Sequence, residues 1–254
     1  MVVEDRDLGR PAFFGCVGFA SPSSVATVLA GNPRRFRDAL LRSEWQRRPV
    51  FLAPKQLRAA NASGDLALLH ISGAPDDLDF TNPRVAELHR VSFSAFMTHC
   101  AGYRIAEFWQ ENLLPEASLY AESMGMVHVR DQTLDDGKTS SLFRFTREDV
   151  MVRPGAQLAF LMNFPPPRLG FSLAQQRLLE LALLDYSDGE SAKHLGISLE
   201  AIRKRWRSIH ARHSFGEGKD QRRALLAYIR QNMEELRPWP SSRVTGATAV
   251  MPGP

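Results

Sequence analysis

The apolar positions in the first two thirds of the chain follow two different periods. Apolar runs of strand length occur at residues 12–19, 66–71, 126–130, 141–145 and 157–163. Apolar positions with helical spacing occur at residues 24–29, 34–42, 83–100, 105–109 and 116–124. Strands mixed with helices in this way are typical of an α+β fold, in which helices cover a sheet.

The strand-like runs near the end of this region are expected to pair with one another. The turn Asp135-Asp136-Gly137 separates residues 126–130 from residues 141–145, and Asp-Gly tolerates the positive φ angles of a tight hairpin. We therefore predict mixed helices with an antiparallel sheet. The stretch 91–164 runs helix, helix, strand, strand, strand, and in this order it is similar to PAS-type and GAF-type sensory folds. Such a domain would sense a signal, for example an unknown small-molecule ligand, or mediate oligomerisation.

The pattern after residue 171 is entirely helical. Ser172 and Gln175 match a capping box, as do Ser187 and Glu190, and each box marks the beginning of a helix. Ser198 is a third N-cap candidate. The helices expected from these signals run from Ser172 to about residue 184, over residues 191–195, from 199 to about 213, and from 220 to about 236. This region is predicted to be an all-α, four-helix domain.

Proline and glycine mark the boundaries between the parts of the chain. Pro165, Pro166, Pro167 and Gly170 cannot continue a helix or a central strand. We therefore predict an α+β domain over residues 1–164, a hinge at 165–171 and the helical domain at 172–237. Residues 238–254 are rich in proline, serine, threonine and glycine, and they are predicted to be a disordered tail.

The charge of the chain is concentrated in the helical domain. The whole sequence carries a formal net charge of +4. Residues 1–171 contain 19 basic and 19 acidic residues, whereas residues 172–237 contain 12 and 9, an excess of +3. A local excess of this kind indicates an anionic partner for that segment.

The third predicted helix combines an apolar stripe with cationic faces. Leu199, Ile202, Trp206 and Ile209 are spaced three, four and three residues apart, so they are expected to pack against the neighbouring helices. Residues 199–213 contain five basic residues and one acidic residue. A helix of this kind suits the major groove of DNA, where arginine recognises guanine edges and basic residues neutralise phosphates.

Two short helices joined through Leu195-Gly196-Ile197-Ser198 are typical of a helix-turn-helix. Residues 173–228 resemble the LuxR-type (GerE-like) helix-turn-helix of bacterial transcription regulators. The stretch 187–198 carries the resemblance, together with Ala201-Ile202-Arg203 and Ile209. The chain departs from the usual pattern at Ser191, where isoleucine is common, and in a longer loop at residues 214–220.

The resemblance implies that the third helix enters the major groove and that the fourth helix contributes to a homodimer. Carried over by position, the base-reading residues are Arg203, Lys204 and Arg207. The resemblance and the cationic faces of the third helix together give four further DNA-binding candidates: Ser198, Arg205, Ser208 and Arg212. The candidate dimer contacts are Leu225, Leu226 and Ile229. The implied partner is double-stranded promoter or operator DNA.

Two other functions remain open. The first domain could hold an enzyme active site while the basic helices dock a protein, or the chain could be a sigma-factor-like promoter-recognition protein. We expect no catalytic residues, metal or cofactor, because the sequence contains no Gly-x-x-x-x-Gly-Lys-Ser/Thr loop and no Gly-x-Gly-x-x-Gly motif. Two cysteines are too few for a disulfide framework, and no apolar run approaches membrane-spanning length. These features favour a cytoplasmic protein without a membrane partner.

Overall fold

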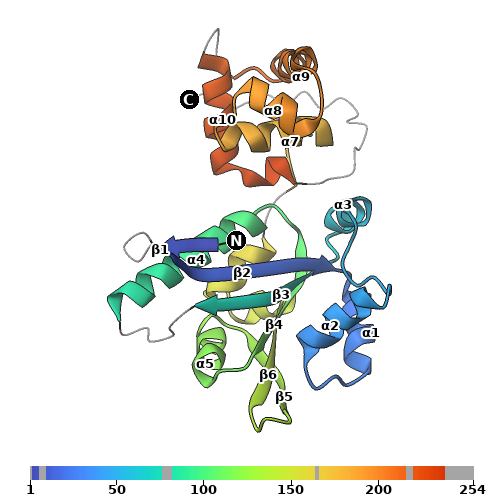
Figure 1. Cartoon of the computed structure of the whole chain (residues 1–254), viewed down its shortest axis with the longest axis vertical. Coiled ribbons are helices and arrows are strands. Elements are labelled where there is room, and N and C mark those ends of the chain that lie inside the picture. The colour runs from blue at the N-terminus through green and yellow to red at the C-terminus, as the bar shows by residue number, and fades with distance from the viewer. Residues whose placement is uncertain (1, 6–9, 76–81, 164–165, 216–219, 238–254) are drawn as a thin grey trace. The chain divides into compact units, whose positions relative to one another are not determined.

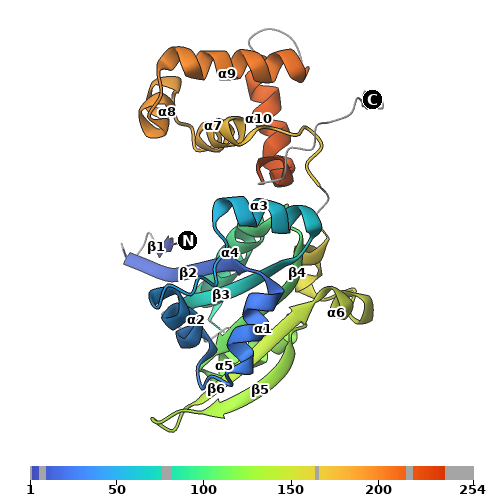
Figure 2. The same cartoon turned by 90° about the vertical axis from the view of Figure 1, so that its right-hand side faces the viewer.

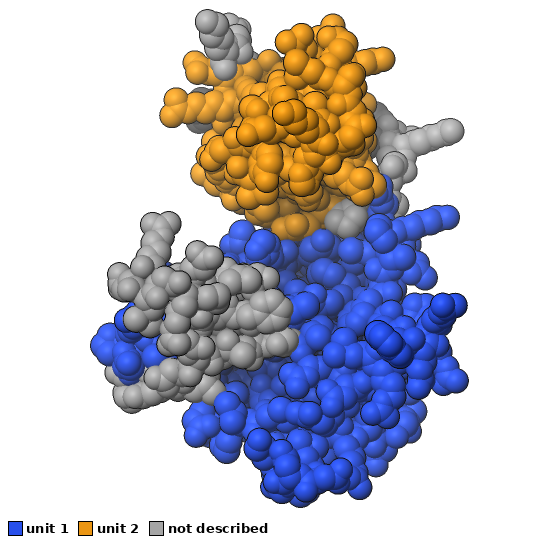
Figure 3. Space-filling model, viewed as in Figure 1, with its two compact units in different colours: residues 1–166 blue, residues 167–254 orange. Residues whose placement is uncertain are grey.

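The computed structural model describes residues 2–5, 10–75, 82–163, 166–215 and 220–237. The chain divides into two compact units, residues 1–166 and residues 167–254 (Figures 1 and 3). The division falls inside the stretch 165–171 that the prolines mark as a hinge. The predicted tail at 238–254 lies outside the described residues.

Unit 1 contains a six-stranded sheet with the order β1-β2-β3-β4-β6-β5. The strands are β1 (Val2–Asp5), β2 (Arg10–Ala20), β3 (Leu66–Pro75), β4 (Ile105–Asn112), β5 (Val127–Thr133) and β6 (Thr139–Thr146). Strands β3 and β4 are parallel, and the other neighbouring pairs are antiparallel. The fold is therefore mixed α+β. The prediction of an antiparallel sheet is correct for the β5–β6 hairpin and wrong for the β3–β4 pair.

The helices of unit 1 match the predicted ones in part. They are α1 (Pro22–Ala30), α2 (Phe36–Trp45), α3 (Pro54–Ser63), α4 (Pro83–Cys100), α5 (Pro115–Ser123), α6 (Arg147–Val152) and the 3-10 helix η1 (Gln157–Met162). The predicted helices at 24–29, 34–42, 83–100 and 116–124 are confirmed. The predicted helix at 105–109 is wrong because this segment is strand β4, and the predicted strand at 157–163 is wrong because this segment is η1.

Helices cover both faces of the sheet. Leu68 packs in one core with residues of α4, α5 and η1, whereas its neighbours Ala67 and Leu69 pack in a second core with residues of α1 and α2. Successive strand residues point to opposite faces, so a strand covered on both sides is apolar throughout. In β4 the buried residues are Ile105, Phe108, Trp109 and Asn112. Their spacing of three, one and three is that of a helix, which explains the wrong prediction.

Among the described residues, unit 2 contains helices and turns only. The helices are α7 (Leu173–Leu183), α8 (Asp188–Leu195), α9 (Leu199–Arg212), α10 (Gln221–Gln231) and the 3-10 helix η3 (Met233–Leu236). Both predicted capping boxes form: the hydroxyls of Ser172 and Ser187 accept from the backbone N–H of Gln175 and Glu190. The fourth predicted helix is divided, because the α-helix ends at Gln231 and a 3-10 turn follows.

A buried carboxylate holds the first residues of unit 2 against its last helical turn. Glu235 is fully buried, and its carboxylate accepts from the backbone N–H groups of Arg168 and Leu169 at 3.0 and 2.9 Å. The hydroxyl of Tyr228 donates to the same carboxylate at 3.3 Å. Burial raises the pKa of Glu235, while these hydrogen bonds act in the opposite direction. The segment that enters unit 2 is thus fixed on η3 by hydrogen bonds rather than by apolar packing alone.

Candidate nucleic-acid interface

Helices α8 and α9 are joined by a tight turn. Gly196 ends α8 with φ +64°, in the left-handed region that favours glycine, and its N–H donates to the carbonyl of Lys193 at 3.2 Å. Two residues later the hydroxyl of Ser198 accepts from the N–H of Ala201 at 3.2 Å and begins α9. Ser198, a predicted DNA-binding residue, is therefore exposed at the first turn of α9.

Helix α9 uses one face to complete the core of unit 2. Ile202, Trp206 and Ile209 are buried among residues of α7, α8 and α10. Leu199 was expected in this stripe but is 40% exposed, so the buried stripe begins at Ile202. In Figure 2, α9 lies along the edge of unit 2, with α7, α8 and α10 on one side of it.

The predicted base-reading residues lie on the outer face of α9. At 3.6 residues per turn, Arg203, Lys204 and Arg207 project away from the buried stripe, and all three are exposed. Arg207 donates to Glu200, about two helical turns earlier, at 2.5 Å, and both side chains are about two-thirds exposed. Among the described residues, the side chains of Arg203 and Lys204 have no ion-pair partner. These two cations are therefore uncommitted.

Two of the other predicted contact residues, Arg205 and Ser208, contact α7. Arg205 is half-buried, and its guanidinium donates to the carbonyl of Ala174 at 3.5 Å. Ser208 accepts from the side-chain amide of Gln175 at 3.4 Å. Arg212 is exposed at the end of α9. Of the two arginines among these further candidates, Arg212 is thus the more accessible.

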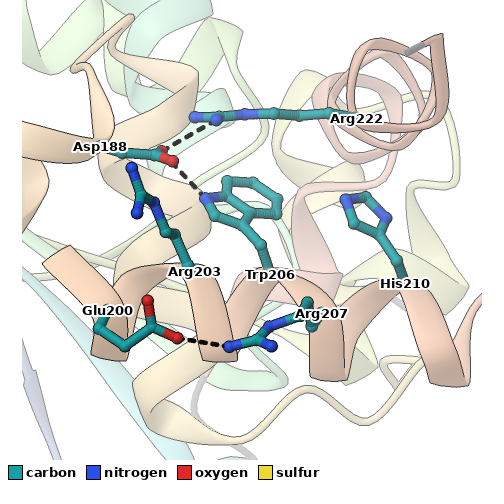
Figure 4. A pocket seen from close by; sticks show the side chains of 7 residues that line it. All are labelled: Asp188, Glu200, Arg203, Trp206, Arg207, His210 and Arg222. Carbon is teal, nitrogen blue, oxygen red and sulfur yellow. Dashed lines mark hydrogen bonds and ion pairs between the residues drawn. The ribbon is translucent and has the colours of Figure 1, made fainter. Parts of the chain in front are cut away.

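A set of polar contacts around Trp206 joins α8, α9 and α10. The indole N–H of Trp206 donates to Asp188 at 3.1 Å, and the guanidinium of Arg222 donates to the same oxygen at 2.9 Å (Figure 4). The Arg222 guanidinium also lies over the indole ring, 4.1 Å from its centroid. The imidazole ring of His210 stacks on the indole ring of Trp206, and the two ring centroids are 5.7 Å apart. Trp206 is therefore a core residue and is not available for stacking on bases.

These side chains line a shallow cavity of about 470 Å³ beside the outer face of α9. The lining residues are Asp188, Glu200, Arg203, Trp206, Arg207, His210 and Arg222. Burial, with a contribution from the nearby Arg222, lowers the pKa of His210. Both effects favour the neutral form of His210, so the arginines supply the positive charge of this surface.

The candidate dimer contacts occupy the inside of unit 2. Leu225 and Ile229 are fully buried in its core, and Leu226 is half-buried. The first two side chains are not accessible to a second copy, because they fill the space between α10 and the other helices. Leu225 and Ile229 are therefore not accessible on the surface of unit 2, and Leu226 remains a candidate for the predicted dimer contact.

Three of the residues that line the cavity beside α9 could not be identified as site residues from the sequence. The sequence pattern indicates no binding role for Asp188 or Arg222, and it indicates Glu200 only as the one acidic residue of α9. The contacts of Asp188 with Trp206 and Arg222 span 18 and 34 residues, and no local pattern indicates them. Glu200 and Arg207 are seven residues apart on one helix, so helical periodicity alone could have identified that pair.

The aromatic and methionine residues of unit 1 that could line a ligand cavity pack mainly in its cores. These are Phe93, Phe96, Met97, Tyr103, Phe108, Tyr120, Met124 and Met126 in one core and Trp109 in the other.

Comparison with known proteins gives no relative: no protein-family model, no curated protein and no solved structure matches the chain. Within the described residues, no helix has both the length and the apolar character needed to cross a membrane.

Proposed function

We propose that the chain is a DNA-binding transcription regulator, in which α8, the Gly196 turn and α9 form a helix-turn-helix and α9 enters the major groove. One observation carries the proposal. Helix α9 buries Ile202, Trp206 and Ile209 on one side and exposes Arg203, Lys204 and Arg207 on another. A helix held by its apolar face and cationic on its free face can lie in the groove without losing its packing.

Recognition would then combine two kinds of contact. Arg203 and Arg207 can each present two parallel N–H donors to the O6 and N7 acceptors of guanine, and Lys204 can reach a base edge or a phosphate. On contact with DNA, Arg207 would exchange Glu200 for an acceptor on the base or backbone. This exchange costs little, because ion pairs between exposed side chains are weak. Ser198, Ser208 and Arg212 would contact the backbone and fix the register of the helix.

The resemblance of residues 173–228 to LuxR-type regulators supports the same proposal. It also implies that two copies of the chain bind the DNA together. Regulators with a helix-turn-helix commonly bind paired half-sites, one copy for each. We propose a homodimer on DNA whose contact uses residues other than Leu225 and Ile229. Unit 1, the mixed α+β unit, would provide the signal input or part of this contact.

The proposal predicts salt-dependent binding to duplex DNA. The measurement is the affinity for a fluorescent duplex of random sequence at several salt concentrations. The affinity should fall steeply with salt, because each neutralised phosphate contributes about −0.9 to the slope of log K against log salt concentration. Arg212→Ala should make this slope shallower by about one such contribution.

The matched control is Lys55→Ala, which removes an exposed cation of α3 in unit 1. This variant should keep the slope of the unmodified chain. An affinity that does not change with salt, or an equal effect of both variants, would contradict binding through α9.

A further inference from the structure

A second cationic surface lies in unit 1, far along the sequence from α9. A cavity of about 730 Å³ opens between α1, α2 and the segment that follows α2. These two helices lie side by side (Figure 1). This volume is within the range of small-molecule sites.

Each of the two helices contributes one face to the cavity. Ser24, Thr27, Val28 and Gly31 are spaced three, one and three residues apart on α1 and the residue after it. On α2 and the residue before it, Arg35, Asp38, Ala39, Arg42 and Ser43 follow the same helical spacing, while Phe36 and Leu40 occupy another face and are buried in the core. Most of these lining residues are small, so the two helices leave space between their facing sides.

The lining is strongly cationic. It includes the arginines Arg34, Arg35, Arg42 and Arg48 and one acidic residue, Asp38, so four positive charges less one give +3. Arg34 is paired with Asp135, and Arg35 is paired with Asp38 at 3.3 Å. Among the described residues, the side chains of Arg42 and Arg48 form no ion pair. Two arginines at one cavity are therefore free to bind an anion.

The backbone that carries these arginines is held in place. The carboxylate of Glu111, on β4, accepts from the N–H groups of Phe36 and Arg37 at 2.7 and 3.1 Å and fixes the first turn of α2. The carboxylate of Glu44 accepts from the N–H groups of Val50 and Phe51 and fixes the segment after α2. The N–H of Arg48 donates to the carbonyl of Ser43 at 2.9 Å. Arg42 and Arg48 are thus presented by ordered backbone, which lowers the entropy cost of binding.

We infer that this cavity binds a small phosphorylated molecule, with Arg42 and Arg48 holding its phosphate groups. Guanidinium groups form paired hydrogen bonds with phosphate oxygens. The hydroxyls of Ser24, Thr27 and Ser43 and the amide of Gln46 line the same cavity and supply polar contacts for the rest of the molecule. The site belongs to unit 1 alone, so it does not depend on the proposed binding of DNA by α9.

The test is isothermal titration of the full chain with inorganic pyrophosphate, which carries the phosphate chemistry without an organic group. We expect saturable binding with one site per chain. Arg42→Ala or Arg48→Ala should weaken it by about tenfold and the double variant by about a hundredfold. The control is Lys55→Ala/Arg90→Ala, which removes two exposed cations of α3 and α4 outside the cavity; this variant should bind like the unmodified chain.

Three results would overturn the inference: absence of binding, equal binding by the folded Arg42→Ala/Arg48→Ala variant, or an equal loss in the control variant. Two further titrations, one with duplex DNA and one with vesicles of anionic phospholipid, distinguish a small phosphorylated molecule from these larger sources of phosphate. If the double variant loses affinity for duplex DNA, or for vesicles of anionic phospholipid, while its binding of pyrophosphate is unchanged, the arginines serve a nucleic-acid or membrane surface and not a small molecule. Circular dichroism of each variant confirms that unit 1 is folded.

Discussion

Replacing Trp206 with alanine is expected to destabilise unit 2 by about 3–5 kcal/mol, the usual cost of removing a large aromatic side chain from a core. Trp206 is buried among α7, α8, α9 and α10, and its indole N–H is bonded to Asp188. The substitution also removes the surface on which the Arg222 guanidinium lies. Because the whole stability of a domain is about 5–15 kcal/mol, this loss should leave unit 2 close to unfolding.

Differential scanning calorimetry measures this effect, because it can separate the transition of unit 2 from that of unit 1. Trp206→Phe keeps most of the ring and loses the N–H donor, so its transition should lie between those of Trp206→Ala and the unmodified chain. Leu199→Ala is the matched control on the same helix, since Leu199 is 40% exposed. Equal transition temperatures for Trp206→Ala and Leu199→Ala would show that Trp206 does not hold the helices together.

The triple variant Arg203→Ala/Lys204→Ala/Arg207→Ala should lose specific DNA binding while remaining folded. Each base contact of this kind contributes about 1–3 kcal/mol, so the combined loss should be at least about 3 kcal/mol, or more than a hundredfold in affinity. Stability should change little, because the three side chains are exposed and, within the part of the chain that the structure describes, Arg207 alone has an ion pair, which is itself exposed.

Binding of the triple variant is measured against both a specific site and a random duplex, with folding checked by circular dichroism. The control is Lys55→Ala/Arg58→Ala/Arg90→Ala, which removes the same number of cations from α3 and α4. This control should retain the affinity for the specific site. If the folded α9 variant binds that site as tightly as the unmodified chain, the residues that read DNA lie elsewhere.

Local signals predicted α4, α7 and α8, whose ends are marked by caps. They did not predict α3, although Pro54 begins it and Gly64 ends it, or α6, although a capping box at Thr146 begins it. Helix α4 begins at Pro83 after the N-cap Asn82 and ends at Cys100, as its periodicity indicates. The capping boxes at Ser172 and Ser187 correctly mark α7 and α8. In these cases the residues that end the element are adjacent to it in the sequence, so sequence alone contains the information.

Local signals failed where distant contacts decide the structure. Strand β4 buries residues on both faces, so its apolar pattern resembles that of a helix. Leu225 and Ile229 form an apolar face on α10, and periodicity cannot show whether such a face packs within the chain or against a second copy. The pairing of Asp188 with Arg222 and the cavity between α1 and α2 depend on tertiary packing, which no local pattern encodes.

The exposed cationic face of α9 could be predicted, because three signals agree within one short stretch of the sequence. The apolar stripe, the turn at Gly196 and the basic residues between the apolar positions all lie within residues 196–212. What could not be predicted is which cations are already paired. Arg207 is bonded to Glu200, and Arg205 is turned toward α7, whereas Arg203 and Lys204 form no ion pair with any residue that the structure describes.

Selection of duplexes from a random-sequence pool by the immobilised full chain tests most directly whether this protein reads DNA through α9. After several rounds, the proposal predicts enrichment of one short motif, repeated as two half-sites if two copies bind. The Arg203→Ala/Lys204→Ala/Arg207→Ala variant should enrich no motif under the same conditions. Retention of random duplexes without any enriched sequence by the unmodified chain, or the same motif with the variant, would contradict the proposal.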